Sequence, residues 1–146
     1  MHLRILVDMI SYGKKFVLDT CVIISILESR GAMADLIKRL IDIESVYLNS
    51  VSLDEASRKG YDREQVVAKI KEYFDAQVIV KDVSEENRID AQKLENKCSL
   101  IHRGDSAIAA FSMEHHSTLI TFDKELIKGC DMVGLPTFNP NWVFFY

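Results

Sequence analysis

The chain has 146 residues, enough for one globular domain with a sizeable core. Its 48% hydrophobic and 27% charged residues are typical of soluble globular proteins, and its net charge of -4 argues against a uniformly basic surface that binds nucleic acid through charge alone. Three separated cysteines, Cys21, Cys98 and Cys130, without a C-x-x-C pair, favour a reducing cytoplasmic location over a disulfide framework or a zinc ribbon.

The first fifteen residues fit no regular element well. Residues 3–10 are apolar, but Arg4 and Asp8 interrupt them, and the stretch is too short to span a membrane. We therefore expect residues 1–15 to be an N-terminal extension of uncertain role and residues 16–146 to form a single domain. No other stretch is apolar enough for a membrane span, so we expect no membrane partner.

Short apolar segments alternate with amphipathic segments along the rest of the chain. Strands are expected at residues 16–19, 46–49, 77–80 and 117–121, and helices at 21–28, 34–41, 50–60, 62–75, 84–98, from 105, and at 122–126. This alternation predicts an α/β fold, a three-layer α/β/α sandwich with a mostly parallel central sheet of four to five strands. We expect the aromatic residues of the tail, 132–146, to pack on the domain or on a second copy of it.

Four acidic residues stand near the ends of these elements. Asp19 and Asp123 follow strands, whereas Glu55 and Asp105 lie near helix starts, so all four could meet at one edge of the sheet. Two full charges about 4 Å apart repel by about 4 kcal/mol at an effective dielectric near 20. Such a cluster therefore needs protonation or a divalent cation, and oxygen ligands favour Mg²⁺ or Mn²⁺.

Three of the acids also have a purely structural interpretation. Asp19 or Thr20 could cap the helix that follows, and Asp105 could be the N-cap of its own helix. Ser52 and Glu55 have the spacing of a capping box. The functional interpretation is favoured because the four acids occur together, each at an element boundary.

Four segments, FVLDTCVI (16–23), SVSLDE (50–55), GDSAIAA (104–110) and LITFD (119–123), are each centred on one of these acids. In this order they resemble the PIN domain nucleases, in particular the toxin ribonucleases of VapBC toxin–antitoxin pairs, over residues 16 to about 140. The resemblance implies a metal-dependent endoribonuclease in which Asp19, Glu55, Asp105 and Asp123 are the catalytic and metal-binding residues. Thr121 and Thr20 would support these carboxylates, and Cys21 departs from the Asn or Ser often found there.

The resemblance also implies partners. These are an RNA substrate, a small antitoxin covering a groove between the helices around residues 23–27 and 36–41, and a second copy in a homodimer. Four basic residues beside the acids could contact RNA phosphates, although exposed charges on helix ends are usually just solvated. They are Arg58, Lys59, Arg103 and Lys124.

Other functions remain open. The same fold could be an RNA-processing PIN factor or a non-catalytic RNA-binding module. A receiver-like or phosphatase-like α/β domain would use Asp19 as a phosphoacceptor, but the first strand lacks the paired acids expected before it. His115 and His116 are adjacent and not one helical turn apart, which disfavours a zinc site.

Overall fold

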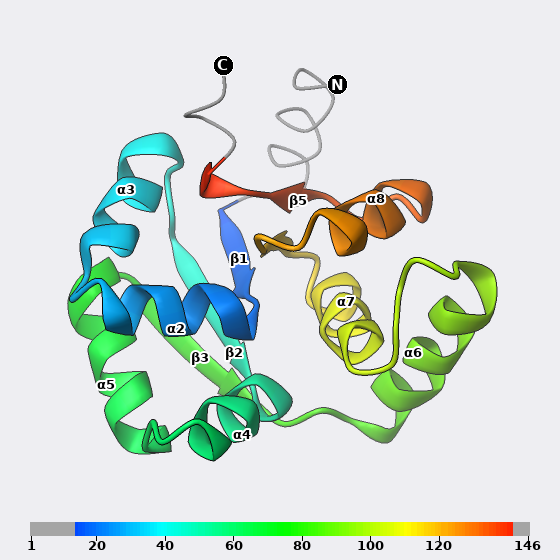
Figure 1. Cartoon of the computed structure of the whole chain (residues 1–146), viewed down its shortest axis with the longest axis horizontal. Helices are drawn as coiled ribbons and strands as arrows, with labels where there is room; N and C mark the ends of the chain where they lie inside the picture. Colours follow the sequence, from blue (N-terminus) through cyan, green and yellow to red (C-terminus); the bar gives the residue numbers. More distant parts are fainter. Residues whose placement is uncertain (1–13, 142–146) are drawn as a thin grey trace.

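The structure is a computed structural model that describes residues 14–141. Most of the expected N-terminal extension and the aromatic residues 142–146 lie outside the described residues. Within residues 14–141, five strands form one sheet in the order β3-β2-β1-β4-β5, and every neighbouring pair is parallel (Figure 1). The strands are β1 (Lys15–Leu18), β2 (Ser45–Asn49), β3 (Gln77–Lys81), β4 (Thr118–Ile120) and β5 (Thr137–Phe138).

Seven helices in the described part of the chain cover the two faces of this sheet. They are α2 (Thr20–Glu28), α3 (Ala32–Leu40), α4 (Ser50–Arg58), α5 (Arg63–Phe74), α6 (Glu85–Lys97), α7 (Asp105–Glu114) and α8 (Lys124–Met132). None of the helices within residues 14–141 is both long and apolar enough to cross a lipid bilayer.

Side-chain alternation along the strands divides the core into two clusters. Phe16 and Leu18 of β1 pack with α2, α3, α4 and α5, whereas Val17 packs with α6, α7 and α8. The two groups of helices lie on opposite sides of the sheet in Figure 1. The predicted three-layer α/β/α sandwich with a parallel sheet is therefore confirmed.

One strand departs from the sequence-based expectation. β5 lies in the segment that we treated as a tail, where it extends the sheet beyond β4 through the hydrogen bond from the Thr121 N–H to the Phe138 carbonyl, 3.1 Å. A strand of two residues is too short to show the alternation from which strands are predicted. The first strand also begins one residue earlier than expected, at Lys15.

The strand order locates the crevice in which a ligand would bind. The chain builds outward from β1 to β2 and β3, then returns to place β4 on the other side of β1. In open α/β sheets, ligands bind at the carboxyl ends of the strands where the order reverses in this way. The order 3-2-1-4-5 also differs from the 2-1-3-4-5 order of receiver domains, so the receiver-like alternative is wrong.

Gly31, which precedes α3, allows a close approach between helices. It has φ +90°, and a Cβ added there would lie 2.6 Å from Cδ1 of Tyr73 on α5. We expect Gly31→Ala to destabilise the protein by about 2–4 kcal/mol, because a left-handed backbone and a steric clash both oppose the methyl group. Gly60→Ala is the matched control, since Gly60 has φ +97° with nothing within 4 Å of the added Cβ. Urea denaturation should show the smaller loss for Gly60→Ala, and equal losses would contradict the clash.

Candidate active site

Asp19 lies directly after β1, where the sheet order reverses. Its backbone is extended, with φ -69° and ψ 156°, and its side chain is 7% exposed. The Thr20 N–H donates to Oδ1 at 2.8 Å, and the Thr121 hydroxyl donates to Oδ2 at 2.7 Å. Burial raises the pKa of Asp19, and the charge of Glu55 adds to that effect, while these hydrogen bonds oppose it. The expected capping role of Asp19 is present, but it occupies one of the two carboxylate oxygens.

Thr121 joins two of the predicted acids. Its Oγ1 donates to Asp19 and accepts the Asp123 N–H at 3.2 Å. Asp123 is the N-cap of α8, and its Oδ1 accepts the N–H groups of Glu125 and Leu126 at 3.0 and 3.2 Å. Both capping bonds use the same oxygen of Asp123. Capping thus fixes the orientation of this exposed carboxylate without using Oδ2.

Asp105 is the first residue of α7 and does not cap it. The N-cap is Gly104, with φ +99° and no side-chain capping bond, so the structural interpretation of Asp105 as a cap is wrong. Burial, together with the charges of Asp19, Asp123 and Glu55, raises the pKa of Asp105 to about 6, and the charge of His102 partly opposes this rise. All three of the other predicted acids therefore lie near enough to act on Asp105.

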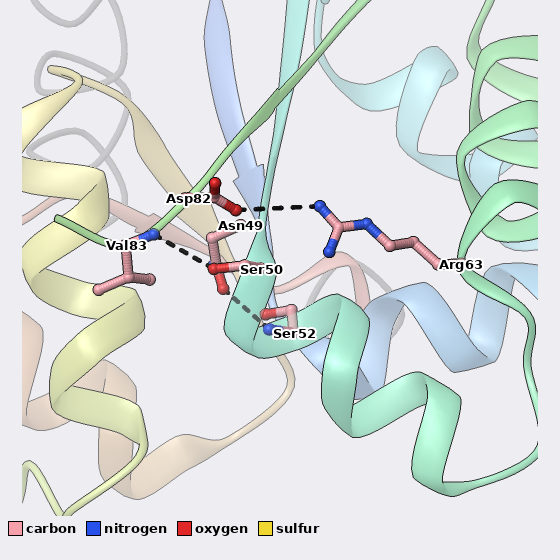
Figure 2. A network of polar contacts seen from close by, with 6 residues as sticks. All are labelled: Asn49, Ser50, Ser52, Arg63, Asp82 and Val83. Carbon is pink, nitrogen blue, oxygen red and sulfur yellow. Dashed lines mark hydrogen bonds and ion pairs between the residues drawn. The ribbon is translucent and has the colours of Figure 1, made fainter.

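The capping box proposed for Glu55 is also wrong. Asn49 is the N-cap of α4, and its Oδ1 accepts the Ser52 N–H at 2.8 Å (Figure 2). Ser52 is therefore inside the helix, and Glu55 lies farther along it, half-buried. Its charge raises the pKa of both Asp19 and Asp105. Glu55 thus has no capping role to account for its position.

Asn49 also belongs to a polar network at the carboxyl ends of β2 and β3. Ser50 Oγ accepts the Val83 N–H at 3.2 Å, and Arg63 Nη2 forms an ion pair with Asp82 Oδ1 at 3.9 Å (Figure 2). Sequence reasoning assigned Asn49 only to the end of a strand. An Asn between a strand and a helix is itself an N-cap signal, and that signal would have identified it.

Cys21 takes the place of a polar side chain beside Asp19. Its Sγ is 3.5 Å from Asp19 Oδ2 and 4.0 Å from Thr121 Oγ1, so a weak thiol contact exists where the family pattern has Asn or Ser. Burial and, to a smaller extent, the charge of Asp19 raise the pKa of Cys21 to about 11. The thiol therefore stays protonated at neutral pH. Thr20 Oγ1 is buried with no hydrogen-bond partner within residues 14–141.

The four basic residues expected to contact RNA lie on the surface. Arg58 and Lys59 end α4, Arg103 precedes α7, and Lys124 begins α8. In the described part of the chain, no ion pair joins any of them to the four predicted acids. Their role in binding RNA stays a prediction.

The carboxylates fit a hydrated divalent cation better than a tightly enclosed one. Among residues 14–141, no three His, Cys, Asp or Glu side chains are arranged so that they could hold a metal ion. Mg²⁺ usually keeps several waters and takes only one or two carboxylates directly, so it does not need an enclosing cage. The mutual repulsion at Asp105 supplies the negative field that such an ion would neutralise.

The raised pKa of Asp105 predicts a pH-dependent cost to stability. A carboxyl group whose pKa is higher in the folded protein stabilises the fold at low pH and loses that contribution as the pH rises through about 6. In metal-free protein, Asp105→Asn should therefore raise the melting temperature at pH 7.5 more than at pH 5. Asp54→Asn, which changes an exposed acid on α4, should show no such difference. An Asp105→Asn protein less stable than the parent at pH 7.5 would refute the repulsion.

Comparison with known proteins agrees with this geometry. The PIN domain family model matches residues 16–131. No curated protein matches the chain.

Similar solved structures include VapBC2 from Rickettsia felis bound to a promoter DNA fragment, with 19% identity, a TM-score of 0.62, and coverage of 86% of this chain and 98% of that chain. FitAcB from Neisseria gonorrhoeae has 21% identity and a TM-score of 0.59 over 86% and 97% of the two chains. VapBC-1 from nontypeable Haemophilus influenzae has 17% identity and a TM-score of 0.61 over 87% and 98%. At identities below 25%, the TM-scores of these structures show a shared fold and nothing more. Since the family match covers most of the chain, including all four acids, the protein belongs to the PIN domain family.

Proposed function

We propose that this PIN domain is a metal-dependent endoribonuclease, the toxin of a toxin–antitoxin pair, that hydrolyses RNA phosphodiester bonds. The observation that carries the proposal is the effect of Asp19, Asp123 and Glu55 on Asp105, whose pKa rises to about 6 at the crevice of the sheet. A cleft that gathers negative charge in this way suits one or two Mg²⁺ or Mn²⁺ ions together with an anionic backbone.

Each acid would have a distinct part in the reaction. Asp19, Asp105 and Asp123 would hold the cation directly or through water, and Glu55 would be a further ligand or would steer the attacking water. The cation would lower the pKa of that water and offset charge on the leaving oxygen. Thr121 would keep the Asp19 carboxylate in one orientation through its 2.7 Å hydrogen bond.

The nuclease proposal predicts that RNA cleavage depends on a metal ion and that each of the four acids is needed for it. Purified protein should cleave single-stranded RNA with Mg²⁺ or Mn²⁺ and lose that activity in a chelator. Asp105→Asn and Glu55→Gln should each reduce the rate by about 100-fold or more, because each removes a charge that the cation or the water needs. Asp54→Asn is the control for Glu55→Gln, since it neutralises the neighbouring, exposed acid on the same helix. Full metal-dependent cleavage by Asp105→Asn would exclude the assignment.

The antitoxin proposal rests on a hollow beside α2. This groove of about 520 Å³ is lined by Leu27 from α2 and by residues of α5 and the turn before it, among them Tyr61, Val66 and Tyr73. The groove predicted from the resemblance lies between α2 and α3 and stays untested, whereas this hollow is lined by α2 and α5. The solved VapBC and FitAB structures are named for two components, which supports a second protein here. A homodimer stays a prediction from the family resemblance.

The proposal implies that a short reading frame next to this gene encodes the antitoxin, and the product of that reading frame can test the groove. Co-expressed with that product, the parent protein should co-purify with it, whereas Leu27→Glu should not, because a charge would replace an apolar wall of the groove. Val80→Glu changes an exposed apolar residue beside a separate hollow on the other side of α5 and should leave the complex intact. Equal recovery of the Leu27→Glu complex would place the partner elsewhere.

A further inference from the structure

Asn49 lies beside Asp19 in the sheet. The paired residues of β1 and β2 include Val17 with Tyr47, and two residues further along both strands are Asp19 and Asn49. On the other side of β1, Leu18 pairs with Ile120, so Thr121 is the next residue beside Asp19. Asn49, Asp19 and Thr121 therefore stand side by side at the carboxyl ends of β2, β1 and β4.

Asn49 and Asp19 also share a face of the sheet. Val17 and Tyr47 both pack with the core cluster formed by α6, α7 and α8. Side chains two residues apart on a strand point the same way, and both Asp19 and Asn49 keep an extended backbone. Both side chains therefore project toward the face that carries α7, whose first residue is Asp105.

In the side-chain amide of Asn49, the oxygen Oδ1 is hydrogen-bonded and the nitrogen Nδ2 is unpaired. Its Oδ1 accepts the Ser52 N–H at 2.8 Å, and only the amide oxygen can accept, so the orientation of the amide is fixed. The Nδ2 group is buried and has no hydrogen-bond partner among residues 14–141, and Asn49 as a whole is 0% exposed. A buried donor without an acceptor bears its full desolvation penalty. The unpaired Nδ2 of Asn49 therefore lowers the stability of the fold, although capping α4 needs only the amide oxygen.

Asp19 has a matching unused acceptor. Its Oδ2 receives the Thr121 hydroxyl and the Cys21 thiol, whereas the only hydrogen bond to its Oδ1 in the described part of the chain comes from the Thr20 N–H. Each oxygen of an ionised carboxylate accepts about two hydrogen bonds. No hydrogen bond joins Asn49 to Asp19 in the structure, so the Nδ2 donor is unpaired and Asp19 Oδ1, on the neighbouring strand, keeps the capacity to accept one more hydrogen bond.

We propose that Asn49 is a positioning residue for Asp19, whose Nδ2 donates to Oδ1, directly or through one water, when a divalent cation occupies the site. Thr121 then holds one carboxylate oxygen from β4 while Asn49 holds the other from β2. This inference rests on the proposed metal site. It adds a residue that acts through Asp19 and does not itself touch the cation.

The test compares Mn²⁺ binding and stability in two variants of Asn49. Asn49→Ala removes both the donor and the helix cap, whereas Asn49→Gly removes the donor but keeps a residue that is nearly as good an N-cap. Calorimetric titration of the full chain with Mn²⁺ should give dissociation constants raised about 10- to 100-fold, and by the same factor, in both variants. Urea denaturation should show Asn49→Ala to be the less stable of the two.

Asn87→Ala is the matched control. Asn87 is also 0% exposed, but it binds Glu114 at the far end of α7 from Asp105, so its loss should lower stability and leave Mn²⁺ binding unchanged. Unchanged Mn²⁺ binding in both Asn49 variants, with binding lost in Asp19→Asn, would overturn the role of Asn49 alone. Binding that weakens only in proportion to lost stability would also overturn it. Unchanged binding in Asp19→Asn would refute the proposed metal site, and the inference with it.

Discussion

The 2.7 Å hydrogen bond between Thr121 and Asp19 is the contact on which the site depends. It crosses from β4 to β1, the point where the strand order reverses and where a parallel sheet opens a crevice. The same hydroxyl accepts the Asp123 N–H, so one side chain sets the position of two carboxylates from distant parts of the chain. Without this link, a 7% exposed Asp19 would have only its neighbours in sequence to oppose the desolvation that raises its pKa.

The grouping of the four carboxylates lowers the stability of the fold while it creates a site for a cation. Asp123 gains from its position, because its charge caps α8 and faces the positive end of that helix dipole. Asp105 also faces the positive end of a helix dipole, that of α7, but Gly104 is the cap of that helix, and burial and three other carboxylates raise the pKa of Asp105. A folded protein keeps an unfavourable cluster of this kind when the cluster serves binding or catalysis. Asp105 and Glu55 are the two of the four acids without a capping bond, and Asp105 is the one whose pKa is raised to about 6.

The sequence predicted the sandwich because its strands and helices alternate with clear patterns. It drew attention to the four acids because each was expected near an element boundary, and the structure places three of them there, Asp19, Asp105 and Asp123. Sequence-based prediction failed where the same local spacing is compatible with two structures. Ser52 and Glu55 have the separation of a capping box, yet α4 begins earlier, so that Asn49 supplies the cap. The two residues of β5 are ordered by pairing with β4, which no local pattern encodes. Whether the Nδ2 of Asn49 is hydrogen-bonded depends on the positions of side chains from other elements, and only coordinates contain that information.

Because the core is divided into two clusters, the site depends on both helical layers of the sandwich. Glu55 is carried by a helix of one layer and Asp105 by a helix of the other, while Asp19 lies at the end of the strand between them. The grouping of these acids therefore exists only while both layers are docked on the sheet. Local opening of α7 alone would disperse the charges before the remainder of the domain unfolds, so the activity of the proposed nuclease would report the cooperativity of its two layers.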